Sequence, residues 1–142
     1  MPIKPITENF AVAPQISAAD IAAVAQLGYT TIINNRPDGE VPGQPNAAEI
    51  EALAKQHGLN FVNIPVSAAT MTPEAVQLMA ATLQTAPGPV LAYCRSGMRS
   101  TTMWALAQAG KMPADEILHH AVQAGYDLSG LEPRLHAKSD IG

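Results

Sequence analysis

The sequence predicts an α/β fold in which helices cover a mainly parallel sheet. Short runs of β-branched or aromatic residues alternate with longer Ala-rich runs along the 142 residues, and 12 prolines and 10 glycines separate them. Strands that alternate with helices of about 10–15 residues are typical of βαβ units. The right-handed crossovers of such units bring ligands to the carboxyl ends of the strands. Functional residues are therefore expected in the connections that follow strands.

The first half of the chain predicts three strands and two helices. The strands are rich in β-branched or aromatic residues and lie at 10–12, 30–33 and 61–64. The first helix begins at Ser17, where Asp20 occupies the capping-box position, and ends at Gly28. The second helix begins at Asn46 and ends at Gly58. Each helix therefore links two strands that are consecutive in the sequence.

The second half continues this alternation. A third helix begins at Thr72, because a cap hydroxyl, a proline at the first helical position and an acidic residue follow one another there, and it runs to Thr85. The next expected elements are a strand at 90–93 and helices at 99–109 and 113–124. Residues 131–142 are weakly patterned and predict no element.

The composition excludes several classes of protein. A hydrophobic fraction of 47% against 14% charged residues is enough for a sizeable core. The net charge of -4 and the absence of a basic run argue against a nucleic-acid partner. The single cysteine excludes an internal disulfide and a Cys-rich zinc site. No signal-peptide pattern and no apolar run of about 18 residues is present. We expect one cytoplasmic domain over 1–142 with no membrane partner, and its oligomeric state stays open.

The connection after the fourth strand carries the residues best suited to chemistry. Cys94 follows the strand, and Arg99 and Ser100 lie where the next helix begins. A loop that curls from a strand end into a helix start points backbone N–H groups at one spot and cradles an anion. The helix N-terminus and the nearby guanidinium favour thiolate over thiol. The sequence therefore predicts a nucleophilic Cys94 in an anion-binding loop formed by Arg95, Ser96, Gly97 and Met98.

Two of these side chains have specific expected roles. The planar fork of Arg99 can hold two oxygens of a bound oxyanion. Ser100 can donate a hydrogen bond to the sulfur and ease its departure as a leaving group. The alternative is a buried structural Cys94 beside an ordinary helix start, because free cysteine is among the most buried residue types.

The loop resembles the active-site loops of two families that use cysteine on anions. One is the tyrosine and dual-specificity phosphatases, with the pattern C-x5-R followed by Ser or Thr. The other is the rhodanese sulfurtransferases, whose small members often carry loops such as C-R-S-G-x-R-S. The wider sequence more closely resembles the phosphatase-like domain of beta-lactamase-hydrolase-like proteins. The matching segments span most of the chain and are Pro14-Gln15, residues 35–40, Ile64-Pro65-Val66 and the Cys94 loop. This resemblance implies a tyrosine-phosphatase-like fold with a mainly parallel sheet of four or five strands and flanking helices.

The chain departs from the phosphatase pattern in three ways. Cys94 and Arg99 are spaced C-x4-R, one residue shorter than in phosphatases and closer to rhodaneses. Tyr93 stands where phosphatases usually have His. The loop after the third strand, which commonly supplies the general acid in phosphatases, has no carboxylate. The alternatives are Asp38 and Glu40 after the second strand, although Pro-Asp-Gly is also an ordinary turn sequence.

One further cation lies close to these carboxylates in the sequence. Arg36 can pair with Asp38 or Glu40, extend the anion site, or belong to a solvated surface pair. No metal or organic cofactor is expected. The adjacent His119 and His120 point about 100° apart on a helix and cannot easily share a metal ion.

The residues thus predict thiolate chemistry on an anionic substrate that bears phosphate or sulfane sulfur. The first hypothesis is a cysteine-dependent phosphatase in which Asp38 is the candidate acid. The second is a rhodanese-type sulfurtransferase that forms a persulfide on Cys94. A third hypothesis, from another class, is a catalytically silent module that only binds the anion.

Overall fold

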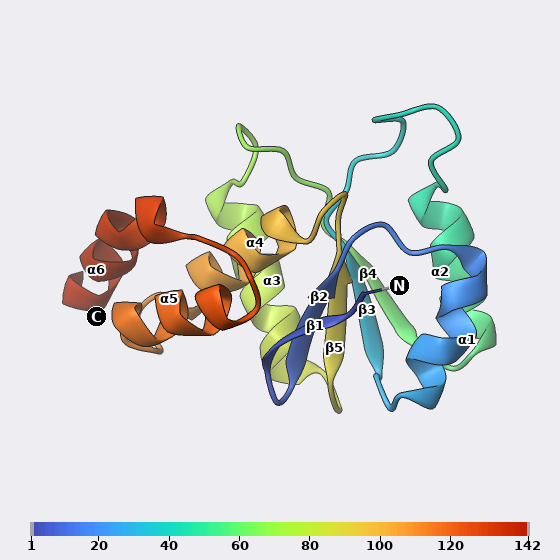
Figure 1. Ribbon diagram of the computed structural model, residues 1–142, viewed down its shortest axis with the longest axis horizontal. Helices are drawn as coiled ribbons and strands as arrows, with labels where there is room; N and C mark the ends of the chain where they lie inside the picture. The colour runs from blue at the N-terminus through green and yellow to red at the C-terminus, as the bar shows by residue number, and fades with distance from the viewer. Residues whose placement is uncertain (1, 142) are drawn as a thin grey trace.

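A five-stranded sheet forms the centre of the protein (Figure 1). A computed structural model describes residues 2–141, with side chains described for 2–136. The strands are β1 (Lys4–Thr7), β2 (Phe10–Ala13), β3 (Thr31–Asn34), β4 (Asn60–Asn63) and β5 (Val90–Tyr93), in the sheet order β1-β2-β5-β3-β4. Strands β2 to β5 pair in parallel, and β1 alone is antiparallel, against β2. The predicted α/β fold with a mainly parallel sheet is confirmed.

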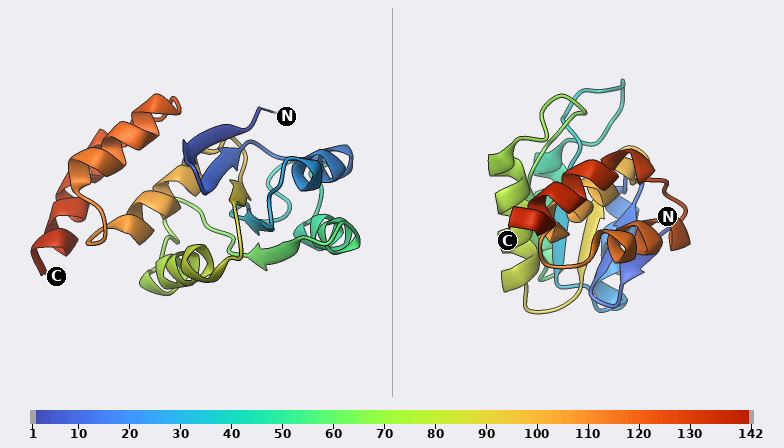
Figure 2. Two further views of the ribbon diagram at one scale, coloured as in Figure 1. Left: turned by 90° about the horizontal axis from the view of Figure 1, so that it is seen from below. Right: turned by 90° about the vertical axis from the view of Figure 1, so that its left-hand side faces the viewer.

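Helices cover both faces of the sheet (Figure 2). The helices α1 (Ala18–Gln26) and α2 (Ala47–Gln56) lie on one face. The other face is covered by α3 (Pro73–Thr85), α4 (Met98–Gln108) and α5 (Ala114–Gln123). After a short 3-10 helix, η1 (Ser129–Leu131), the last helix α6 (Glu132–Ile141) packs against α4 and α5. Alternate residues of a strand point to opposite faces, so Val90 and Ala92 of β5 join one core, and Leu91 and Tyr93 join the other.

The helix α4 is the most deeply buried helix in the fold. Both Trp104 and Met103 are buried, as are the hydroxyl residues Ser100 and Thr101 in its first turn. The Trp104 ring stacks on Phe10 of β2 with 6.2 Å between ring centroids. Since β5 is also completely buried, both ends of the connection between β5 and α4 are held by the core.

One strand and one α-helix were not expected from the sequence, nor was the short η1. β1 contains a proline, which sequence patterns disfavour in strands, but β1 is an edge strand, where a missing N–H is tolerated. The helix α6 lies in the segment predicted to be unpatterned, and the buried side chain of Leu135 anchors it to the core. Among the helices that the structure describes, none has the length and apolar character to cross a membrane.

Candidate active site

Four connections meet at the carboxyl ends of the parallel strands, and backbone hydrogen bonds tie them together. The Asn35 N–H donates to the Tyr93 carbonyl at 2.8 Å, and the Val66 N–H donates to the Asn35 carbonyl at 3.0 Å. The Gln15 N–H donates to the Arg95 carbonyl at 3.4 Å. The loops after β2, β3, β4 and β5 therefore form one connected surface, at the edge where parallel sheets bind ligands.

Cys94 lies directly after β5 and is buried. Its Sγ accepts a hydrogen bond of 3.0 Å from the Gly97 N–H. Gly97 has φ +94° and precedes the first residue of α4, so the sulfur lies close to the positive end of that helix. One backbone amide thus points at a sulfur that is itself buried, and the thiolate at Cys94 stays a prediction.

Gly97 is required for conformational and steric reasons. Its φ lies in the left-handed region, which side chains disfavour. A Cβ atom at this position would also collide with the hydroxyl of Tyr126. The close approach of Tyr126 to the loop therefore depends on the absence of a side chain.

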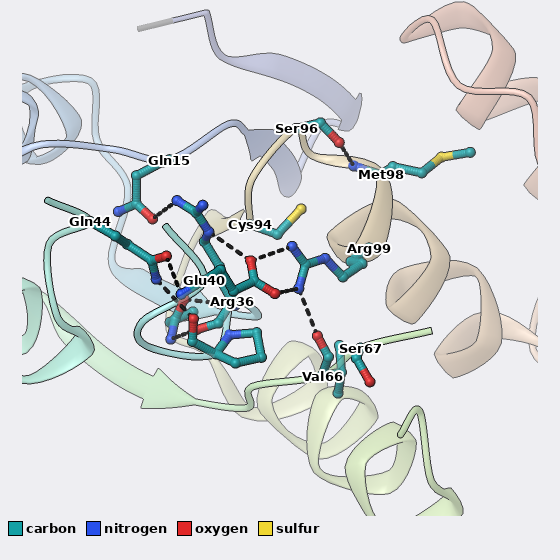
Figure 3. A network of polar contacts seen from close by, with 12 residues as sticks. Gln15, Arg36, Glu40, Gln44, Val66, Ser67, Cys94, Ser96, Met98 and Arg99 are labelled. Carbon is teal, nitrogen blue, oxygen red and sulfur yellow. Dashed lines mark hydrogen bonds and ion pairs between the residues drawn. The ribbon is translucent and has the colours of Figure 1, made fainter. Parts of the chain in front are cut away.

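The guanidinium of Arg99 is bound by a carboxylate of the protein itself (Figure 3). Its Nη1 and Nη2 donate to the two oxygens of Glu40, each at 2.8 Å, and Nη1 also donates to the Val66 carbonyl at 3.0 Å. Arg36, which is buried, donates from Nε to the same Glu40 at 2.9 Å and from Nη1 to Gln15 at 3.0 Å. The pairing of Arg36 with Glu40, one of the alternatives predicted, is thus formed.

This arrangement sets the charge of Glu40. Hydrogen bonds from Arg99 and Arg36 lower the pKa of Glu40 from 4.5 to about 2, and the Glu40 hydrogen bond raises the pKa of Arg99. At neutral pH the carboxylate is ionised and occupies the fork that the sequence assigns to an oxyanion. A planar carboxylate resembles such an anion in charge and geometry, so a ligand of Arg99 has to compete with Glu40.

Two candidate catalytic side chains, those of Asp38 and Ser100, differ in their contacts. Asp38 Oδ1 accepts a hydrogen bond of 2.8 Å from the N–H of Ala47, the first residue of α2, whereas Asn46 makes no side-chain cap. Asp38 therefore caps α2 from the preceding loop, and its role as an acid stays a prediction. The buried hydroxyl of Ser100 has no hydrogen-bond partner among the described residues, so the expected bond to Sγ is not formed in this conformation.

The other predicted loop residues line the surface. Arg95 and Ser96 are exposed, and Met98 is 38% exposed. Ser96 Oγ accepts a hydrogen bond of 3.3 Å from the Met98 N–H, so this amide has an internal partner. The amides of Arg99 and Ser100 lie in the first turn of α4, where no acceptor exists within the helix.

Sequence reasoning missed two residues of this site. Gln15 orients Arg36, and its place beside Pro14 in a matching segment is the only signal that could have found it. Tyr126 belongs to none of the motifs of the predicted site, but its hydroxyl donates to the Ser96 carbonyl at 3.0 Å. No local pattern connects it to a loop 30 residues away.

The fold and the cysteine-containing loop together define an α/β protein of the phosphatase type. The chain belongs to the family of the beta-lactamase hydrolase-like protein, phosphatase-like domain, whose sequence profile matches residues 2–111. The resemblance seen in the sequence is therefore confirmed.

The relatives extend this assignment. A beta-lactamase hydrolase-like protein of Agrobacterium fabrum is 34% identical over 125 residues, which are 87% of this chain and 29% of the relative. One from Xylella fastidiosa is 36% identical over 132 residues, or 90% of this chain and 30% of the relative. The chain thus spans about a third or less of the length of these curated relatives.

Solved structures share the fold over nearly the whole chain. A candidate phosphatase of Neisseria meningitidis has a TM-score of 0.84 and 38% identity, over 97% of this chain and 99% of the other. Tk-PTP in its active form has a TM-score of 0.67 at 15% identity, over 96% and 94% of the two chains. The fold is therefore tyrosine-phosphatase-like, as predicted.

The capping contact of Asp38 predicts a difference between two substitutions. Asp38→Ala should lower the free energy of unfolding by about 1 kcal/mol, because it removes a helix cap. Asp38→Asn should leave stability nearly unchanged, since asparagine caps equally well. Urea denaturation of both variants measures this, and an alanine variant as stable as the wild type contradicts the capping role.

The low pKa of Glu40 predicts a pH-dependent contribution to stability. A carboxylate with a folded-state pKa below its unfolded value stabilises fully above the unfolded value and loses that effect as the pH falls towards the folded one. The difference in unfolding free energy between the wild type and Glu40→Gln should therefore be largest near neutral pH and shrink between about 4.5 and about 2. Urea denaturation over this pH range measures the difference.

The control is Glu51→Gln. Glu51 pairs with Lys55 at 3.2 Å on the exposed face of α2, where an ion pair contributes little. A Glu40→Gln effect that is independent of pH, or no larger than that of Glu51→Gln, contradicts the predicted role of the two arginines.

Proposed function

We propose that this chain is a cysteine-dependent phosphatase in which Cys94 is the nucleophile. The observation that carries the proposal is the hydrogen bond from the Gly97 amide to Cys94 Sγ, at the start of α4 and within a phosphatase-type fold. The sulfur forms a bond to phosphorus as the bond from phosphorus to the leaving oxygen breaks. Water then attacks phosphorus, the S–P bond breaks, and phosphate and the thiolate are released.

The loop supports this chemistry through its donors. The first-turn amides of α4 and the fork of Arg99 are placed to stabilise the oxygens of a transferring phosphoryl group. Arg95, Ser96, Gly97 and Met98 provide the walls of the anion site, and Arg36 adds positive charge behind Glu40. Ser100, whose hydroxyl has no hydrogen-bond partner in the described part of the chain, is available to donate to the departing sulfur during hydrolysis of the intermediate.

Substrate has to rearrange this closed site. Cys94 is buried, and Glu40 occupies Arg99. A phosphoryl group that enters the loop replaces one anionic partner of Arg99 by another, so the guanidinium keeps a negatively charged partner. The Val66 carbonyl, which also binds Arg99, keeps the guanidinium in place during the exchange.

The carboxylates constrain the class of substrate. A pKa of about 2 keeps Glu40 ionised at neutral pH, so it is a poor proton donor in this conformation. Asp38 remains our candidate acid, although its carboxylate caps α2. This arrangement favours phosphate esters whose leaving group is a stabilised oxyanion, such as aryl phosphates.

A sulfurtransferase is the second candidate, and the short spacing of Cys94 and Arg99 favours it. In this reaction Sγ takes the outer sulfur of thiosulfate, a new S–S bond forms, and sulfite leaves. The persulfide then passes that sulfur to an acceptor thiol. No proton has to be delivered to a leaving alkoxide, which suits a site whose carboxylates are engaged elsewhere.

The phosphatase proposal predicts loss of p-nitrophenyl phosphate turnover in two variants. Cys94→Ser should reduce turnover to the background rate. Arg99→Lys should reduce kcat about 100-fold, because it keeps the charge and loses the bidentate fork. Arg134→Lys, an exposed arginine on α6, is the matched control and should turn over like the wild type. Equal rates for the wild type and Cys94→Ser contradict the proposal.

Exposure to thiosulfate separates the second candidate from the first. A sulfurtransferase should gain the mass of one sulfur atom, and Cys94→Ser should gain none. An unchanged intact mass contradicts sulfur transfer. Inactivity in both assays, together with thermal stabilisation by sulfate, would instead identify an anion-binding module without catalysis.

A further inference from the structure

One peptide group in the loop is bonded at both ends. The carbonyl of Ser96 accepts a hydrogen bond of 3.0 Å from the Tyr126 hydroxyl, and the N–H of Gly97 donates one of 3.0 Å to Cys94 Sγ. These two groups belong to the same planar peptide, which is trans like every described peptide bond, so its C=O and N–H point in opposite directions. Tyr126 and the sulfur therefore lie at opposite ends of one peptide dipole.

The backbone alone does not select this orientation. Rotation of the peptide between Ser96 and Gly97 would turn its carbonyl oxygen towards the sulfur, where it would oppose a negative charge. Glycine tolerates both signs of φ, so Gly97 places little steric barrier against that rotation. An external partner that holds the carbonyl away from the sulfur is therefore needed, and the Tyr126 hydroxyl is placed to do so.

Tyr126 is well suited to hold the carbonyl. Its side chain is buried, its N–H donates to the Ala121 carbonyl at 2.9 Å, and Lys4 of β1 lies 4.9 Å from the centre of its ring. Burial, together with the nearby charge of Cys94, raises the pKa of Tyr126 above 10, so its hydroxyl remains a donor while a thiol titrates. The ring is thus fixed by contacts that do not involve its hydroxyl.

We infer that Tyr126 is a positioning residue that fixes the peptide between Ser96 and Gly97 and so directs its N–H at the Cys94 sulfur. The chain of hydrogen bonds from hydroxyl to carbonyl and from amide to sulfur also polarises the peptide in the direction that favours a thiolate. The inference rests on the proposed function only in taking Cys94 as the reacting group.

Other charges around the sulfur stay in place when the hydroxyl is removed. Arg99 on α4 faces Cys94, Lys4 on β1 lies over the Tyr126 ring, and Glu40 lies beyond Arg99. Tyr126→Phe keeps the ring and all three of these groups. A change in thiol titration in this variant therefore reports the loss of the hydrogen bond from the hydroxyl to the peptide, and not a change of local charge.

The test is the pH dependence of thiolate formation in Tyr126→Phe. The chain has one cysteine, so the ultraviolet absorbance of the thiolate, with Cys94→Ser subtracted, reports Cys94 alone. The midpoint should rise by about half a pH unit, a roughly threefold loss of thiolate on the acidic side. Tyr29→Phe, a partly buried tyrosine outside the site, is the control and should not shift the midpoint.

A second measurement avoids any loss of packing. Biosynthetic replacement of the three tyrosines by 3-fluorotyrosine makes each hydroxyl a stronger donor, so the midpoint should shift in the opposite direction. The same label in Tyr126→Phe should produce no such shift. An unchanged midpoint in both Tyr126→Phe and the labelled protein overturns the inference.

Turnover separates this inference from the proposed function. Both expected shifts with no turnover of p-nitrophenyl phosphate by the wild type would support the role of Tyr126 and contradict the phosphatase. Turnover by the wild type with no shift of the midpoint in either measurement would support the phosphatase and contradict the role of Tyr126.

Discussion

The short passage from β5 to α4 is the constraint on which the site depends. Both elements are buried, so their positions are set by the core, and only residues 94–97 connect them. In this turn Gly97 adopts a left-handed conformation, which its lack of a side chain permits. The same turn places the Cys94 sulfur against the amide that opens the helix. The packing of β5 and α4 into the core thus also determines where the Cys94 sulfur lies.

Charge balance in the site is achieved by a side chain from another loop. Arg36 and Arg99 lie on separate elements, and Glu40 joins them through both of its oxygens. Without a negatively charged partner, the two guanidinium groups would face each other in a partly dry site, and their repulsion would be energetically costly. Glu40 therefore holds the two guanidinium groups together by placing a negative charge between them.

Two residues from outside the four strand-end loops lie close to the loop between β5 and α4. Lys4 comes from the edge strand β1, and Tyr126 comes from the segment after α5. Tyr126 covers Gly97, the position at which a side chain would collide with the tyrosine. An edge strand and a segment outside the sheet thus both contribute to the surroundings of the loop between β5 and α4.

The sequence by itself determined the alternation of strands and helices and the position of Cys94 at a strand end, because these depend on local hydrophobic pattern, capping and glycine placement. Pairing of Arg36 with Asp38 or Glu40 was one of several alternatives that the sequence left open, and the structure forms the pair with Glu40. Only the tertiary structure decided that Arg99 shares that carboxylate, that Asp38 caps a helix, and that Tyr126 holds the loop. The bonds of Arg99 and Tyr126 join residues far apart in the chain, whose side chains meet only after the sheet and its helices have packed.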